Sequence, residues 1–236
     1  MPNVHVANID PEFIDRFLDG RKVGPVTKNF INRQLSVFFG WCVQRPRRWM
    51  TANPCREIKI DTGEKSAPKI LTVEECRIIL SAAEAHKDGR TARYLAVCLF
   101  GGLRPTEALK LDWKQVNLDE SEIRLDATQT KTKKGRVVKI HPTLAAWLKA
   151  YKNQPFHPLN WRKEFNAVKA AGLKTWTRDI MRHTALVIIF ASGSYGFCAE
   201  QFGNSEAVIR AHYQGRVSSG ETKAFYQIMP TKGRGK

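Results

Sequence analysis

The feature that most constrains this chain is an apolar helix that begins with charged residues, TRDIMRHTALVIIFASG at positions 177–193. Its hydrophobic side chains cover more than one face, which predicts a helix buried by its neighbours and an Arg182 side chain buried with it. A guanidinium remains charged, and its planar fork fits a carboxylate or a phosphate. Arg182 therefore needs an acceptor inside the protein, and a structural Asp or Glu is the ordinary one when no second signal is present.

A second signal follows in SEAVIRAHYQG, at positions 205–215. This pattern predicts a short basic helix with Tyr213 at its end, where the chain turns through Gly215. A tyrosine in such a place is usually half-buried, with its hydroxyl in water. The alternative is that it presents a phenol to a phosphate.

The composition points to a basic globular protein. The 236 residues include 39 Lys and Arg against 22 Asp and Glu, a net charge of +17, and 42% of them are hydrophobic. A chain of this length and hydrophobicity is expected to bury a sizeable core, and its charge predicts a polyanionic partner, most often nucleic acid. Ribosome-associated and membrane-surface proteins are also basic, so charge alone defines no mechanism.

The cysteines and the apolar segments bear on location. Five cysteines, at positions 42, 55, 76, 98 and 198, are scattered and form no CxxC pair, so we expect neither disulfides nor a zinc site. The N-terminal sequence has no basic start followed by an apolar run, and the apolar stretch near Ile188 is too short to span a membrane. We therefore expect a cytoplasmic protein without a membrane partner.

Residues 1–63 are predicted to form a small helical unit. PEFIDRFLDG at 11–20 has the pattern of a short amphipathic helix, and VTKNFINRQLSVFFGWCVQRPRRW at 26–49 that of a longer one ended by Pro46. A polar stretch without hydrophobic period follows, and we place a linker at 64–71. The longer helix is expected to turn these side chains inward: Phe30, Ile31, Leu35, Phe38, Phe39 and Cys42.

The remainder, residues 72–236, is predicted to be mainly helical with one small sheet. Thr72 through Glu75 has the pattern of a capping box. GLRPTE at 102–107 follows a buried helix and a Gly-Gly break, which places Arg104 at a turn and predicts a salt bridge to Glu107. A three-stranded antiparallel sheet is predicted by three alternating pairs: Val116 and Leu118, Ile123 and Leu125, and Val138 and Ile140.

The turn before the last of these strands is rich in lysine, TKTKKGRVVK at 130–139. A solvated basic hairpin is the simplest interpretation of this run. The alternative is that it carries a catalytic lysine, for which Lys131, just before the turn, is the first candidate.

Taken in order, GLRPTE at 102–107, a hairpin lysine, DIMRH at 179–183, GNS at 203–205 and RAHY at 210–213 resemble the tyrosine recombinases of the phage integrase family. The similarity runs from about residue 69 to the end, and the 31 positions from Arg182 to Tyr213 (213 − 182) are usual for that family. The resemblance implies a mainly α fold with a small antiparallel β-sheet (α+β). It also implies that residues 72–236 are a catalytic domain and that residues 1–63 are part of a helical core-binding (SAM-like) domain.

By this resemblance, one set of side chains acts on a DNA phosphate without a metal or another cofactor. Tyr213 is the nucleophile that forms a 3′-phosphotyrosine. Arg104 and Arg182 stabilise the phosphorane, and Lys131 protonates the leaving 5′ oxygen.

Further residues receive supporting roles from the same resemblance. His183 and Glu107 are expected to support the catalytic side chains from behind. Lys133 and Lys134 are alternative general acids. Four basic residues are expected to contact DNA: Lys133, Lys134, Arg45 and Arg47.

Two candidate catalytic positions depart from the family pattern, in which histidines are usual. Asn204 replaces one histidine and can still donate a hydrogen bond to a phosphate oxygen. Asp179 replaces the other, and a carboxylate about 4 Å from a phosphate costs roughly 4 kcal/mol at an effective dielectric constant near 20. Pairing with Arg178 or Arg182 would lower that cost, and acceptance of the tyrosine proton is another role open to Asp179.

The function implied is a site-specific recombinase or integrase that acts on double-stranded DNA as a homo-oligomer, from dimer to tetramer. An accessory DNA-bending protein is a further candidate partner. The alternative is a catalytically silent DNA-binding remnant of an integrase, whereas a type IB topoisomerase or a basic RNA- or ribosome-binding protein fits less of the pattern. The C-terminal segment 218–236 is predicted to form a short helix that either docks on a neighbouring protomer or packs on its own domain.

Overall fold

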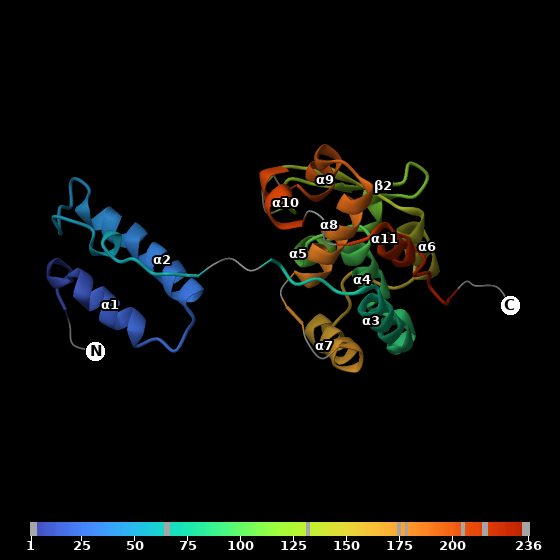
Figure 1. The fold of residues 1–236 in the computed structure, drawn as a ribbon, viewed down its shortest axis with the longest axis horizontal. Coiled ribbons are helices and arrows are strands. Elements are labelled where there is room, and N and C mark those ends of the chain that lie inside the picture. The colour runs from blue at the N-terminus through green and yellow to red at the C-terminus, as the bar shows by residue number, and fades with distance from the viewer. Residues whose placement is uncertain are drawn as a thin grey trace. The chain divides into compact units, whose positions relative to one another are not determined.

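The computed structural model describes residues 4–63, 67–130, 133–173, 176–177, 179–203, 206–213 and 217–232, except the side chains of 208 and 211–213 (Figure 1). The chain divides into two compact units, Met1–Ser66 and Ala67–Lys236, and each is described by itself. The predicted fold class is confirmed, because the elements are mainly helices together with one small antiparallel sheet.

The described residues of the first unit form two helices and two short 3-10 turns. Asp10 accepts a hydrogen bond from the Phe13 amide at 2.7 Å and so caps α1, which Pro11 begins. Ile14 and Leu18 of α1 pack with Phe39 into a small buried core. The elements in chain order are η1 (Val6–Asn8), α1 (Pro11–Asp19), α2 (Pro25–Val43) and η2 (Pro54–Arg56).

The predicted inward face of α2 is wrong in two of its six residues. Phe30 and Phe38 are 61% and 49% exposed. The helix has apolar residues around most of its circumference, and within this unit α1 and η2 cover only one side of it. Val37 and Trp41 are exposed as well, so α2 presents a second, uncovered apolar face.

The second unit contains the sheet and the remaining helices. The capping box predicted at Thr72 and Glu75 is present, with reciprocal hydrogen bonds of 2.8 and 3.1 Å. Its elements are α3 (Val73–Ala85), η3 (Lys87–Gly89), α4 (Ala92–Leu99), α5 (Pro105–Ala108), η4 (Trp113–Gln115), β1 (Val116–Asn117), β2 (Glu122–Leu125), β3 (Arg136–Lys139), α6 (Pro142–Ala150), α7 (Trp161–Gly172), α8 (Ile180–Ser192), α9 (Tyr195–Phe202), α10 (Glu206–Tyr213) and α11 (Ser219–Tyr226).

The three strands form the predicted antiparallel sheet in the order β1-β2-β3. Ile123 of β2 lies opposite Val138 of β3, and both side chains are buried. Because side chains alternate along a strand, Arg136 lies on the same buried face as Val138. Arg136 is thereby directed into the domain rather than into solvent.

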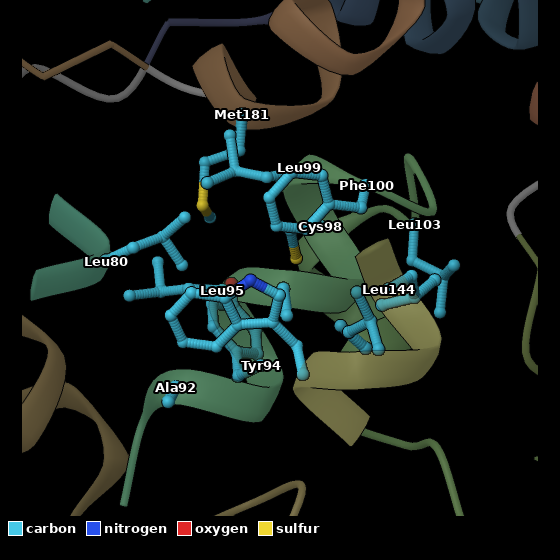
Figure 2. Close-up of a cluster of buried hydrophobic side chains, with 14 of the residues drawn as sticks. Leu80, Ala92, Tyr94, Leu95, Cys98, Leu99, Phe100, Leu103, Leu144 and Met181 are labelled. Atoms are coloured by element: carbon cyan, nitrogen blue, oxygen red, sulfur yellow. The ribbon is translucent and has the colours of Figure 1, made fainter. Parts of the chain in front are cut away.

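Helix α4 is the centre of the second unit. All its residues are buried, and it contacts α3, α6 and α8. Figure 2 shows Leu95, Leu99 and Phe100 packed among side chains of neighbouring elements, including Leu144 and Met181. Apart from Arg93, which donates to the Lys152 carbonyl, the side chains of α4 are apolar or aromatic, as expected of a core helix. Among the helices that the structure describes, none combines the length and the apolarity that a membrane crossing needs.

The C-terminal segment packs on its own unit, which selects one of the two predicted alternatives. Phe225 of α11 is fully buried and Ile228 is 6% exposed. The indole N–H of Trp147 donates to the Ile228 carbonyl at 2.8 Å, and the Thr143 hydroxyl donates to the Tyr226 carbonyl at 2.5 Å. Helix α11 is therefore part of the core around α3 and α8.

We expect Phe225→Ala to lower the free energy of unfolding of the chain by about 3–5 kcal/mol, because it leaves a cavity beside Phe100. Urea denaturation followed by circular dichroism measures this change. Met229→Ala removes a neighbouring exposed side chain and should change the free energy by less than about 0.5 kcal/mol. Equal effects of the two substitutions would contradict the packing of α11 on this core.

Candidate active site

Arg104 stands at the turn between α4 and α5. Pro105 begins α5 directly after it, because proline supplies the dihedral angle of a first helical residue and lacks the N–H that would be left without a partner there. The Arg104 amide donates to Glu107 Oε2 and its Nη1 donates to Glu107 Oε1, both at 2.9 Å. The expected pair is therefore present, and it holds the Arg104 side chain at the start of α5 with 17% of its surface exposed.

Glu107 binds a second arginine that the sequence analysis did not select. Arg136 of β3 donates from Nη1 to Oε1 at 3.0 Å and from Nη2 to Oε2 at 2.6 Å. The carboxylate is fully buried, and burial alone would raise its pKa. The hydrogen bonds and charges of Arg136 and Arg104 outweigh that effect and hold the pKa of Glu107 at about 2, against an ordinary value of 4.5.

Arg182 is buried on α8, as predicted, with 5% of its surface exposed. Its Nη1 donates to the Gly102 carbonyl and its Nη2 to the Phe202 carbonyl. The guanidinium carbon also lies 5.2 Å from the centre of the Phe202 ring. The acceptors in these contacts are backbone carbonyls, whereas the sequence predicted a carboxylate or a phosphate.

These contacts bring Arg182 to the same turn as Arg104. Gly102, whose carbonyl binds Arg182, is separated from Arg104 only by Leu103. Gly102 has φ +66°, and a Cβ built there would lie 2.1 Å from the Phe202 ring. The close approach of α9 therefore requires glycine in this turn.

A cavity of about 720 Å³ opens beside this turn. Arg104 and Asp179 line it together with an aromatic wall, in which the Tyr94 and Trp161 ring centres are 4.0 Å apart. Asp179 precedes α8 with φ +58°, a left-handed conformation that asparagine and aspartate adopt more readily than most residues. Burial, then Cys98 and Asp179, raise the pKa of the Tyr94 hydroxyl, which keeps it protonated.

The other predicted catalytic residues fall partly outside the described residues. Lys131 and Asn204 lie outside them. Tyr213 is the last residue of α10, whose backbone contacts α8 and α9, but its side chain is not among those described. His183 follows Arg182 on α8 and is half-buried. The structure thus brings Arg104, Arg182 and Asp179 to one region, and α10 packs against the helix that carries Arg182.

The predicted DNA-binding residues lie in two places. Lys133 and Lys134 are exposed on the loop between β2 and β3. In the first unit, Arg45 is exposed, whereas Arg47 lies over the Trp41 ring at 3.8 Å and donates from Nε to the Trp41 carbonyl at 2.9 Å. Their contacts with DNA remain predictions.

Known proteins resemble this chain in sequence and in fold. Residues 69–163 match the phage integrase family. The tyrosine recombinase XerC of Chlamydia muridarum is 28% identical over 134 residues, which is 55% of this chain and 41% of the relative. The chain therefore spans about two fifths of the length of that curated relative.

Solved structures share the fold. A lambda integrase fragment, crystallised as a dimer bound to a COC′ core site, superposes with a TM-score of 0.71 at 16% identity over 92% of this chain and 85% of the other. A lambda integrase tetramer bound to a Holliday junction gives 0.69 at 18% identity, over 87% and 67%. The second unit thus has the fold of an integrase catalytic domain. The resemblance to the tyrosine recombinases of the phage integrase family that the ordered motifs predicted is confirmed.

We expect Glu107→Gln to destabilise the fold and to change its response to acid. The carboxylate has a pKa of about 2 when folded and about 4.5 when unfolded, so its contribution is complete above pH 4.5 and is lost as the pH falls toward 2. The substitution should lower the free energy of unfolding at neutral pH by about 3–5 kcal/mol, because it breaks a buried ion pair. Urea denaturation at a series of pH values from neutral to acid measures both effects.

Glu120→Gln is the matched control, since Glu120 forms an exposed pair with Arg124 on the same sheet. It should change the free energy of unfolding by less than about 1 kcal/mol. Below pH 4.5, stability should fall less steeply in the Glu107 variant than in the unaltered chain. An unchanged slope would show that the Glu107 carboxylate does not hold these arginines.

Proposed function

We propose that this chain is a site-specific DNA recombinase that cuts and rejoins one strand at a time through a 3′-phosphotyrosine at Tyr213. The match of residues 69–163 to the phage integrase family and the similarity to a tyrosine recombinase support this class of reaction. The observation that carries the proposal is the convergence of two guanidiniums, Arg104 and Arg182, on the turn that contains Gly102. Arg104 precedes α5 and Arg182 lies on α8, far apart in the sequence, and their approach to one turn supports a site built from both.

Two neighbouring arginines have a clear role in the cleavage of a DNA phosphodiester. Tyr213 gives its phenol proton to water as its oxygen attacks a DNA phosphorus, which forms the phosphotyrosine bond and breaks the bond to the 5′ oxygen. The pentacoordinate intermediate carries extra negative charge on its non-bridging oxygens, which fixed guanidiniums stabilise most effectively where water is excluded. In the proposal, Arg104 and Arg182 bind these oxygens.

Proton transfer completes the proposed step. The departing 5′ oxygen takes a proton from a lysine of the loop between β2 and β3, with Lys131 the first candidate and Lys133 or Lys134 the alternatives. The energy of the broken phosphodiester is retained in the phosphotyrosine, so a 5′ hydroxyl of another strand can attack it and rejoin the DNA.

The substrate and assembly follow from the same proposal. The lambda integrase structures contain a dimer on a core site and a tetramer on a Holliday junction. We propose that this chain likewise acts on double-stranded DNA as a dimer to tetramer. Its net charge of +17 supports a polyanionic substrate. The first unit would act as a core-binding domain, with Arg45 on its surface.

A covalent trapping experiment tests the function. The chain is incubated with duplexes that carry a randomised core and a nick, so that the short product of cleavage diffuses away and religation fails. We expect a protein–DNA adduct that resists denaturing detergent, and sequencing the trapped DNA then defines the preferred site. Tyr213→Phe should abolish the adduct, because phenylalanine has no oxygen to attack phosphorus.

Tyr195→Phe is the control, since Tyr195 lies at the start of α9 beneath the Arg210 side chain. It should form the adduct at a rate within about threefold of the unaltered chain. A chain that shifts DNA on a gel but never becomes attached to it would instead be the catalytically silent binder. An adduct that persists in Tyr213→Phe would exclude Tyr213 as the nucleophile.

We expect Asp179→Asn to raise the rate of cleavage by tenfold or more. The carboxylate lines the cavity beside Arg104, and its repulsion of a bound phosphate is worth roughly 4 kcal/mol at 4 Å, a ceiling near a thousandfold. Asparagine tolerates the left-handed backbone at this position, so the fold should be retained. Single-turnover trapping on the selected duplex measures the rate. Asp119→Asn, on an exposed turn and not among the residues that line the cavity, removes the same charge and should leave the rate unchanged. A slower Asp179→Asn would show that the carboxylate takes part in the reaction.

A further inference from the structure

A buried hydroxyl, that of Thr130, helps to close the loop between β2 and β3. Thr130 is 6% exposed, donates to the Lys134 carbonyl at 2.8 Å and accepts from the Lys134 amide at 3.2 Å. The same residue lines the cavity that contains Arg104. The lysine candidates for the general acid thus belong to a loop whose two ends are joined beside that cavity.

Arg136, two residues beyond Lys134, anchors the strand that leaves this loop. Both its terminal nitrogens bind Glu107, and its Nε donates to the Gln201 carbonyl at 3.1 Å. Only 8% of its side-chain surface is exposed. One guanidinium therefore joins β3 to α5 and to α9, the helix that precedes α10 and Tyr213.

A second contact fixes the same strand to α9. The Gln201 side chain accepts from the Lys139 amide at 2.8 Å and donates to the Lys139 carbonyl at 3.2 Å. It thereby occupies the place that a neighbouring strand would take at this edge of the sheet. Strand β3 is held to α9 at both ends, by Arg136 and by Lys139.

A contribution to stability does not by itself explain the buried ion pair between Arg136 and Glu107. Desolvation of buried ions is costly, and hydrophobic residues of similar volume often stabilise a fold as well or better. A lysine could not reproduce the contact either, because its single nitrogen cannot bridge both carboxylate oxygens and also reach the Gln201 carbonyl in one plane. What the arginine fork adds is a fixed distance between the hairpin and the Arg104 turn.

We propose that Arg136 is a positioning residue for proton transfer to the leaving 5′ oxygen. It holds the hairpin, and therefore its general-acid lysine, against the turn that carries Arg104, and it acts through Glu107 rather than on the DNA. This inference rests on the proposed function. It assigns to Arg136 a role distinct from those of the two arginines that bind the phosphate.

The test uses a leaving group that needs no proton. In a duplex from the trapping experiment, sulfur replaces the bridging 5′ oxygen at the cleaved phosphate, and a thiolate departs readily because thiols are far more acidic than alcohols. We expect Arg136→Met to slow cleavage of the ordinary duplex by about a hundredfold, within the range that general-acid catalysis contributes. The variant should cleave the sulfur duplex at a rate within about threefold of the unaltered chain, because departure of the thiolate does not depend on the lysine.

Three variants complete the design. Thr130→Val keeps the side-chain shape but loses both contacts that close the loop, so it should show the same selective defect on the oxygen duplex. Arg136→Lys keeps the charge without the fork and should also be impaired on that duplex alone. Arg124→Met removes an exposed arginine of the same sheet and should cleave both duplexes normally.

The outcomes separate the inference from the function on which it rests. Normal cleavage of the oxygen duplex by Arg136→Met would overturn the positioning role. So would an equal loss on both duplexes, because Arg136 would then support the phosphate site or the fold as a whole; thermal unfolding of the variant distinguishes these two. Failure of the unaltered chain to form an adduct with either duplex would overturn the proposed function, and the role of Arg136 with it.

Discussion

The sharing of one buried carboxylate by two arginines holds the candidate site together. Glu107 is fully buried, and without Arg104 and Arg136 its ionised form would be costly enough to favour protonation. Glu107 lies on α5, Arg104 stands in the turn just before that helix, and Arg136 comes from β3. Ionic hydrogen bonds, which are directional, therefore add to the apolar packing of Ile123 and Val138 in fixing the hairpin relative to the Arg104 turn.

The Arg182 contacts show how the same region is completed from the other side. Its guanidinium binds the carbonyls of Gly102 and Phe202, so it joins the turn before α5 to the end of α9. Arg136 joins α5 and α9 as well, by different atoms. Helix α9 leads into α10, at whose end Tyr213 lies. Arg136 and Arg182 thus hold the C-terminal end of α9, which precedes α10 and the candidate nucleophile. They do so through hydrogen bonds to backbone carbonyls.

Sequence patterns predicted the elements with strong local signals. The capping box at Thr72, the sheet and the burial of Arg182 follow from short-range rules of periodicity and capping, and the structure contains all three. The face of α2 was mistaken because periodicity shows which residues are apolar but not how much of a helix its neighbours cover.

Arg136 was missed because the lysines before it dominate the segment. The available signal was that Arg136 lies two residues before Val138. In a strand this spacing places both side chains on the same buried face, where an arginine needs a partner, as Arg182 does.

The contact between Gly102 and Phe202 couples two distant positions in the chain. A methyl group at residue 102 would overlap the phenyl ring, and the positive φ there adds strain for any other amino acid. The ring cannot be enlarged or shifted either, because the carbonyl of the same residue binds Arg182. A substitution at Gly102 or at Phe202 is thus constrained by the residue at the other position. In related sequences, the two positions should change together or not at all, whereas nearby exposed positions should vary freely.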